Sequence, residues 1–205
     1  MKPDPSTLAI MSWSPENVKA ARFVCDIYWG LGGGRLDWDP RAIAQKAEAE
    51  VKNQGYDFSY WGPEVEFFVF DRVTWDVMVP SRGQGYAIES KEAAWNGGGS
   101  GYPIRFKEGY FPAPPSDTLM DFRSECSVIL EEDFGIVVDA HHHEVATGGQ
   151  CEIDMTRSTL VRMADSVQSY KFVIKNLAMQ KGLVATMMPK PIFMDNGSGM
   201  HVNSS

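Results

Sequence analysis

Two glutamates on either side of a Thr-Gly-Gly turn form the first group in the sequence whose types and spacing could do chemistry. Glu144 and Glu152 are separated by an even number of residues, and residues 141–143 just before them are all histidine. Side chains alternate along a strand, so a hairpin centred on Gly148 and Gly149 would place both carboxylates on one face. Acidic groups repel one another at short range. Their clustering therefore suggests a cation between them.

A second acidic pair and a late histidine extend this group. Glu64 and Glu66 are two residues apart in an apolar segment, so they share one face of an expected strand, and His201 lies near the C-terminus. Carboxylate oxygens favour hard cations, and imidazole also accepts Mn²⁺. Four carboxylates with one histidine suggest a Mg²⁺ or Mn²⁺ site, with two metals as one option. A structural zinc site would need closely spaced cysteines instead.

Each of these signals has a plainer interpretation when it is taken alone. Glu64 and Glu66 fit solvated residues on an exposed strand face, and residues 141–143 fit the end of a loop with one packed ring. His201 alone is more often a core or surface histidine than a ligand. Glycines 197 and 199 fit an ordinary turn. The residues alone leave these alternatives open.

The composition excludes several classes of function. The 205 residues carry a net charge of −8, which disfavours nucleic acid as the main partner because phosphate binding needs a basic face. The longest apolar runs fall short of the roughly 20 residues that cross a bilayer, so we expect no membrane partner. The first residues show no secretory signal. The three cysteines are scattered without a CxxC motif, which favours a reduced, cytoplasmic location.

The expected strands occupy six segments. The segment at 65–70 is rich in aromatic and β-branched residues, and 73–79 is expected to pair with it across a turn at Asp71-Arg72. Glycine-rich segments at 26–37 and 95–102 are expected to be loops. The remaining expected strands lie at 6–11, 22–27, 136–140 and 184–187.

Three helices are expected between these strands. Asp39 and Pro40 favour a helix from 40 to about 53, with Asp39 as N-cap. Ser116 is expected to cap a second helix that ends at Gly135, and an apolar stripe predicts a third over 160–181. Strand hairpins with helices between them indicate the α+β class.

Five segments, taken together and in order, resemble the glutamine synthetase family. Their sequences look most like those of its type I, archaeal-like members. The resemblance covers almost the whole chain and is highly specific. The segments are GPEVEFF at 62–68, EGYFPAPPSD at 108–117, HHHEVATGGQCE at 141–152, MPKP at 188–191 and NGSGMH at 196–201.

The resemblance implies a fold and an activity. The fold would be a curved antiparallel sheet with flanking helices, as part of the catalytic domain. The activity would be ligation of ammonium to L-glutamate with ATP as a substrate, through a γ-glutamyl phosphate at a site with two Mg²⁺ or Mn²⁺ ions. Phosphoryl transfer of this kind depends mainly on positioning and charge neutralisation. The family assembles as a homo-oligomer, a double ring of six.

The resemblance also implies residue roles. Glu144 would have two, since it would bind metal and also favour the ammonium cation beside Tyr110. The roles carried over are Glu66, Glu144 and Glu152 for the first metal, Glu64 and His201 for the second, Asn196 and Gly197 for glutamate, Tyr110 for the ammonium pocket, and Asp139, Asn203 and Ser205 for the nucleotide.

Several features depart from the family pattern. Residues 1–27 correspond to the end of an N-terminal β-grasp domain and 28–205 to the N-terminal half of the catalytic domain, so we expect a partial subunit. We expect that this chain alone does not make glutamine efficiently. We also expect it to associate with itself or to be poorly soluble. Asp139 replaces a usual glutamate, Asn203 a common histidine, and Arg157 an aromatic residue that often stacks on adenine.

Three rival functions remain open at this point. One is a related ligase that joins glutamate to another amine, which only substrate profiling would separate. Another is an ATP:guanidino phosphotransferase, which the NGSG segment disfavours. The third is a non-catalytic derivative of the family, which the intact set of five metal ligands disfavours.

Overall fold

The computed structural model describes residues 1–30, 32–96 and 101–205. Its centre is a six-stranded antiparallel sheet built around one long strand, β5 (Tyr60–Phe70). On one edge of β5 lie β9 (Gln150–Met155) and β10 (Ser158–Thr159), with β8 (Val138–His143) beyond β9. On the other edge lie β12 (Met200–Ser204) and then β11 (Val184–Thr186).

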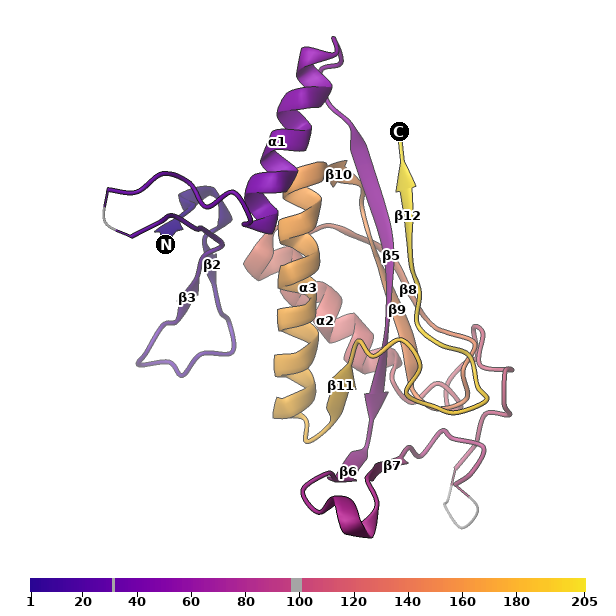
Figure 1. Cartoon of the computed structure of the whole chain (residues 1–205). Helices are drawn as coiled ribbons and strands as arrows, with labels where there is room; N and C mark the ends of the chain where they lie inside the picture. The colour runs from indigo at the N-terminus through magenta and orange to yellow at the C-terminus, as the bar shows by residue number, and fades with distance from the viewer. Residues whose placement is uncertain (31, 97–100) are drawn as a thin grey trace.

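Helices cover one face of this sheet. α2 (Met120–Phe134) and α3 (Leu160–Gln180) pack on it, and α1 (Pro40–Asn53) packs in turn on α3 (Figure 1). The odd-numbered residues of β5, Val65 and Phe67, enter the core shared with both helices. The fully buried Tyr170 of α3 donates its hydroxyl hydrogen to the Val65 carbonyl at 2.6 Å, which fixes α3 on the strand. Alternation along β5 therefore points the even-numbered residues to the opposite face.

The N-terminal segment lies apart from the main sheet, on the far side of the helices (Figure 1). It contains two short antiparallel pairs, β1 with β4 and β2 with β3, and a 3₁₀ turn. These elements are β1 (Lys2–Pro3), η1 (Pro5–Thr7), β2 (Ala9–Ile10), β3 (Ala21–Arg22) and β4 (Cys25–Asp26).

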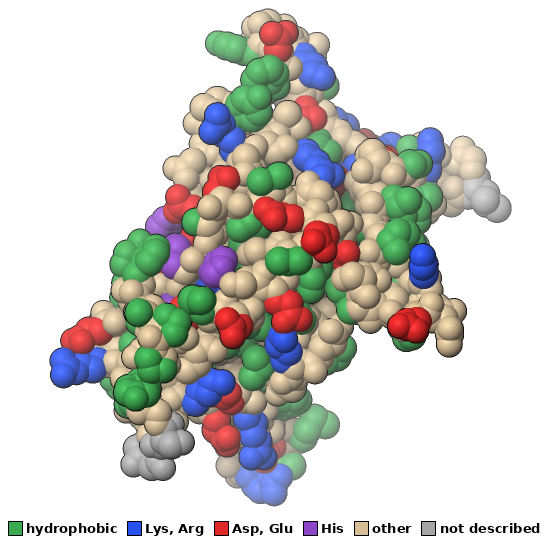
Figure 2. All heavy atoms as spheres, turned by 180° about the vertical axis from the view of Figure 1, so that it is seen from behind, with side chains coloured by type: hydrophobic (Ala, Val, Ile, Leu, Met, Phe, Trp, Pro, Cys, Tyr) green, Lys and Arg blue, Asp and Glu red, His purple; other side chains and the backbone are tan. Residues whose placement is uncertain are grey.

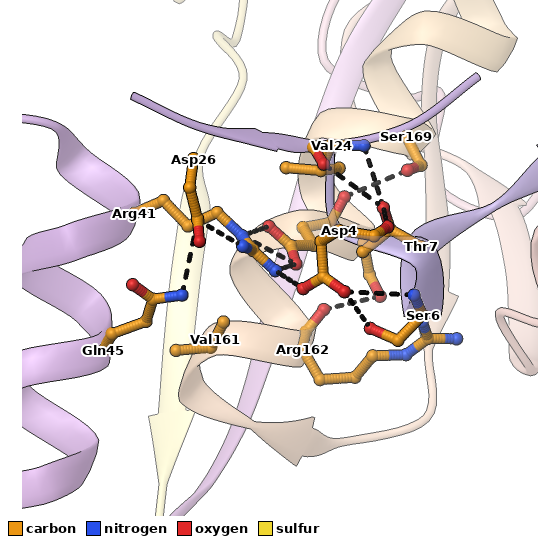
Figure 3. A network of polar contacts seen from close by, with 12 residues as sticks. Asp4, Ser6, Thr7, Val24, Asp26, Arg41, Gln45, Val161, Arg162 and Ser169 are labelled. Atoms are coloured by element: carbon orange, nitrogen blue, oxygen red, sulfur yellow. Dashed lines mark hydrogen bonds and ion pairs between the residues drawn. The ribbon is translucent and has the colours of Figure 1, made fainter. Parts of the chain in front are cut away.

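Arg41 joins this segment to two helices. Its guanidinium contacts Asp4 at 2.6 Å, Asp26 at 2.5 Å and Asp165 of α3 at 2.9 Å (Figure 3). The Asp39 carboxylate caps α1 by accepting from the Arg41 backbone N–H at 3.1 Å. The capping residue predicted for this helix is thus confirmed, and its first turn carries the cation that holds the N-terminus.

The predicted strand pairing at 73–79 is wrong. β6 (Arg72–Asp76) pairs with β7 (Gly85–Glu89), which follows a short 3₁₀ turn, η2 (Pro80–Arg82). Both edges of β5 are already occupied at this level, by β11 on one side and by the Gly149 turn on the other, where the Val69 N–H donates to the Gly149 carbonyl at 2.8 Å. No backbone edge is left there for β6.

Other predicted boundaries also need correction. Ser116 does not cap α2, because the Asp117 carboxylate accepts from Leu119 N–H and binds Arg123, and the helix begins only at Met120. The strand predicted at 136–140 begins later, at Val138, and includes all three histidines. In place of the strands predicted at 6–11 and 22–27, the structure has only the two-residue strands β2, β3 and β4 and part of the η1 turn.

Several other predictions hold. The end of the second helix at Gly135 is confirmed by that residue's left-handed conformation, and the third helix and the strand that follows it lie where expected. Part of the loop predicted at 95–102, residues 97–100, lies outside the described residues, as does Leu31 in the loop predicted at 26–37. Among the residues described, no helix is long and apolar enough to cross a membrane.

Candidate metal site

Strand register places three polar side chains in one row on the face of the sheet opposite the helices. Glu66 of β5 lies directly across from Glu152 of β9, and Glu152 lies directly across from His142 of β8. Residues paired in this way across antiparallel strands share a face. Figure 2, drawn from behind, shows histidine side chains close to acidic ones on the molecular surface.

Glu144 joins this row from the end of β8, as the hairpin predicts. Ligand atoms of His142, Glu144 and Glu152 all lie within 4.8 Å of one another. The His142 ring contacts Glu144 at 3.4 Å through Nδ1 and Glu152 at 3.5 Å through Nε2. The turn is tight, because Gly149 has a φ of +74° and a Cβ there would lie 2.0 Å from the Val69 carbonyl oxygen. Only glycine fits that position.

Glu64 and His201 form a second group, next to the first along β5. They are paired in register between β5 and β12, and the His201 Nδ1 lies 3.3 Å from a Glu64 carboxylate oxygen. Asn203 donates to the other Glu64 oxygen at 2.9 Å. Gly199 lies between the groups, since a Cβ there would meet both Glu66 Oε1 at 3.1 Å and His201 Nε2 at 3.2 Å.

In the first group, the ionised forms of Glu152 and Glu66 are disfavoured in the protein alone. The pKa of Glu152 is raised to about 9, first by burial and then by the neighbouring carboxylates Asp154, Glu144 and Glu66. Burial also raises the pKa of Glu66. Within the part of the chain that the structure describes, no Lys or Arg forms an ion pair with Glu66, Glu144 or Glu152. A divalent cation fits this set, because oxygen-rich ligands with an imidazole suit Mg²⁺ or Mn²⁺.

The loop that carries Asn196 and Gly197 is tied to the first group by Gln150. The Gln150 side-chain amide donates to Glu66 at 2.6 Å and to the Gly197 carbonyl at 3.1 Å. The buried Asp195 accepts from Thr147 N–H at 2.8 Å and from Asn196 N–H at 2.9 Å. The structure therefore brings the predicted glutamate-binding loop beside the predicted metal ligands.

Tyr110 also lies beside the row, on a loop that approaches β8. Its ring meets the His142 ring edge-on with centroids 5.5 Å apart, and the following Phe111 stacks on the same imidazole at 4.4 Å. Tyr110 is 59% exposed, so its ring is open to a small solute.

The three predicted nucleotide-binding residues lie at the opposite end of the sheet from the hairpin turn. Asp139, at the start of β8, accepts from the Thr156 hydroxyl just beyond β9. Asn203 and Ser205 lie at the end of β12, where Ser205 exchanges two backbone hydrogen bonds with Tyr60. Register places these strand ends together but supplies no direct contact among the three residues.

The sequence did not identify His142, Gln150 or Asp195 as residues of the candidate site. Strand alternation was the signal for His142, because it separates the three consecutive histidines. His141 contacts Arg123 and Ser124 of α2, and His143 is fully buried, while His142 faces the carboxylates. Gln150 and Asp195 gave no local signal, because their partners are distant in the sequence.

The sequence and fold match known proteins over nearly the whole chain. Residues 37–205 match the family described as "Glutamine synthetase, catalytic domain". The chain is 51% identical over 203 residues to a glutamine synthetase of Sulfolobus acidocaldarius, covering 99% of this chain and 42% of that protein. It is 49% identical over 188 residues to a 3-hydroxylaminophenol mutase of Cupriavidus pinatubonensis, covering 88% and 39%.

A cryo-electron microscopy structure of Plasmodium falciparum glutamine synthetase superposes with a TM-score of 0.87 at 30% identity, over 99% of this chain and 40% of that one. The α+β fold with an antiparallel sheet and flanking helices, expected from the sequence, is thereby confirmed. The chain belongs to the glutamine synthetase catalytic domain family. It spans about two fifths of the length of these relatives.

Proposed function

We propose that this chain contributes the metal-binding part of an enzyme that ligates ammonium to L-glutamate with ATP, through γ-glutamyl phosphate. The observation that supports this most directly is the convergence of Glu66, Glu144 and Glu152 on one face of the sheet. Membership of the family supports the reaction class. The proposal treats the activity as a property of the whole enzyme, of which this chain is a partial subunit.

The proposed metal ligands follow the two groups of side chains. Glu66, Glu144 and Glu152 would hold one divalent cation, and Glu64 with His201 would hold a second. When bound, Mg²⁺ or Mn²⁺ would neutralise charge on the ATP phosphates and the transferring phosphoryl group. The protein's part is to keep the carboxylates fixed on neighbouring strands of one sheet before substrate arrives.

The substrate roles follow from neighbours of these groups. Asn196 and Gly197 would bind glutamate, on a loop that Gln150 joins to Glu66. Glu144 and Tyr110 would form the ammonium pocket, because a carboxylate beside an open aromatic ring attracts a small cation and accepts its proton. Asp139, Asn203 and Ser205 would contact the nucleotide, at the far end of the sheet.

The organisation of the whole enzyme is also part of the proposal. Residues 1–27 would be the end of a β-grasp domain and 28–205 the first half of the catalytic domain. The assembled enzyme would be a cytoplasmic homo-oligomer, a double ring of six. The N-terminal pairs β1–β4 and β2–β3, which lie apart from the main sheet, are compatible with such a division.

A chimera tests the proposed activity. In it, residues 1–205 replace the matching part of the Sulfolobus acidocaldarius enzyme, and formation of γ-glutamyl hydroxamate from glutamate, ATP and hydroxylamine is measured with Mg²⁺ or Mn²⁺. We expect activity that Glu144→Gln reduces by about 10² or more, as for loss of a transition-state contact. A folded chimera that binds metal but forms no hydroxamate contradicts the proposal.

The mutase relative gives a second candidate, a rearrangement of 3-hydroxylaminophenol. The same chimera, incubated with that compound in place of glutamate and ammonium, separates the two functions. Turnover of the phenol without hydroxamate formation would favour the second candidate.

A further inference from the structure

A buried glutamate beneath the site joins three separate segments of the chain. Glu92 is 1% exposed, and its two carboxylate oxygens face four donors. Oε1 accepts from the Thr118 backbone N–H and hydroxyl, each at 2.7 Å, just before α2. Oε2 accepts from Gly149 N–H at 3.1 Å and lies 3.1 Å from His143 Nε2. Each of the two carboxylate oxygens therefore has two hydrogen-bond partners in the protein interior.

His143 carries the connection from Glu92 to the site. Its Nδ1 lies 2.8 Å from the Gly109 carbonyl oxygen and 2.6 Å from the Glu144 carbonyl oxygen. Carbonyl and carboxylate oxygens only accept, so the hydrogen-bond network assigns a hydrogen to each ring nitrogen. The fully buried imidazole thus bridges the Glu92 carboxylate and the backbone of two site segments.

Those two segments are the ones that carry Glu144 and Tyr110. Gly109 packs so closely on the segment that follows β8 that a Cβ would lie 2.5 Å from the Glu144 and Ala146 carbonyl oxygens. Phe111 N–H donates to the His143 carbonyl at 3.3 Å, and Gly109 N–H to Val145 at 3.0 Å. The Tyr110 loop is therefore fastened to the strand end at Glu144, through contacts on both sides of Tyr110.

We propose that Glu92 is a positioning residue which, through His143 and Gly149, fixes Glu144 against the Tyr110 loop and so sets the metal affinity of the site. The proposal rests on the proposed function, because it assumes that Glu144 binds a divalent cation. Partners of this kind that orient a ligand from behind typically change metal affinity by about 10–100-fold when they are lost.

Glu92→Gln removes the negative charge and replaces one acceptor oxygen with an NH₂ donor. The amide has the shape of the carboxylate, but its NH₂ group must face either the two donors at Oε1 or the two donors at Oε2. In either orientation a buried backbone N–H, of Thr118 or Gly149, meets a donor. Glu89→Gln is the matched control, because Glu89 is an exposed glutamate three residues away and its ion pair with Arg72 is exposed too.

The experiment measures Mn²⁺ binding and amide hydrogen exchange of the 205-residue chain and both variants, well below their melting temperatures. We expect Glu92→Gln to weaken Mn²⁺ binding about 10–100-fold and to speed exchange at Gly109, Phe111 and Gly149, with the amides of α3 unchanged. Glu89→Gln should change neither. A folded Glu92→Gln with unchanged Mn²⁺ affinity and unchanged local exchange overturns the proposal.

Two further outcomes are informative. If the unmodified chain binds no Mn²⁺, the proposed metal site fails, and local exchange at Gly109, Phe111 and Gly149 alone decides whether Glu92 positions the loop. If Glu92→Gln does not fold, NMR of the unmodified chain decides. Two protected ring N–H signals from His143 support the bridge, and a single or rapidly exchanging one overturns it.

Discussion

Two clusters of acidic side chains in this molecule differ in how their charge is balanced. In the first, Asp4, Asp26 and Asp165 surround the guanidinium of Arg41 at 2.5 to 2.9 Å (Figure 3). In the second, Glu66, Glu144 and Glu152 face one another on the open side of the sheet, with His142 among them. Both gather three carboxylates from distant parts of the sequence, but only the first includes a protein cation within the described chain.

The pKa values of the two clusters move in opposite directions. Hydrogen bonds from Ser6 and Arg41 lower the pKa of Asp4 to about 2, and Arg35 with Arg41 lowers that of Asp26. Burial and neighbouring carboxylates raise the pKa of Glu152 to about 9. The carboxylates of the first cluster are balanced by a cation of the protein, and we propose that those of the second bind a cation from outside the chain.

Removal of the protein cation is expected to have the largest effect. Arg41→Met leaves Asp4 and Asp165 without their cation, while Asp26 keeps its ion pair with Arg35, so we expect the free energy of unfolding to fall by about 3–5 kcal/mol, as measured by urea denaturation. Lys46→Met is the control, since its ion pair with Asp37 is exposed, and we expect a far smaller change than for Arg41→Met. Equal effects from the two variants would show that the Arg41 cluster does not hold the N-terminal segment.

Removal of one carboxylate from the second cluster is expected to change metal binding more than the stability of the metal-free protein. For Glu152→Gln we expect little loss of stability in EDTA at pH 7, because the native side chain is already largely protonated there. The rise in melting temperature that Mn²⁺ gives the unmodified chain should be strongly reduced. An unchanged Mn²⁺ shift in the variant would remove Glu152 from the ligand set.

The second cluster should also make stability depend on pH. Between about 4.5 and about 9 the unfolded chain has an ionised Glu152 while the folded chain keeps the proton, so the metal-free protein loses stability as pH rises. Bound metal requires the ionised form, so the Mg²⁺-induced rise in melting temperature should be larger at pH 8.5 than at pH 6. A shift that shrinks with pH would contradict this.

The smallest effect on stability is expected from substitution of Asp4, the most exposed carboxylate of the first cluster. The pKa of Asp4 is lowered in the folded state, so its contribution is present above pH 3.8 and is lost as pH falls toward 2. Asp4→Asn should lower stability at pH 7 by about 0.2–1 kcal/mol, since Asp4 is partly exposed. In acid titrations the difference between Asp4→Asn and the unmodified chain should disappear.

Local patterns predicted those parts of the fold and site whose partners are near in sequence. The Asp39 cap, the left-handed Gly135 and the shared face of Glu64 and Glu66 follow from neighbouring residues alone, and the structure agrees. Glu144 and Glu152 also come together as the hairpin predicts.

Features that depend on distant partners were not predictable from the sequence. Pairing of β6 with β7 follows from occupation of both β5 edges, by β11 on one side and by the turn at Gly149 with β9 on the other, all of which come much later in the sequence. The late start of α2 follows from Arg123 binding Asp117. Glu92 and Asp195 lie in loops with no local motif, and only their buried donors identify them.

The most direct test of the account is Mn²⁺ binding by the 205-residue chain, followed by the electron paramagnetic resonance signal of free Mn²⁺. We expect saturable binding that Mg²⁺ displaces and that a Glu66→Gln, Glu152→Gln double variant abolishes, while Asp4→Asn binds normally. Absence of saturable binding, or equal binding by the double variant, would contradict the claim that the second cluster is a metal site.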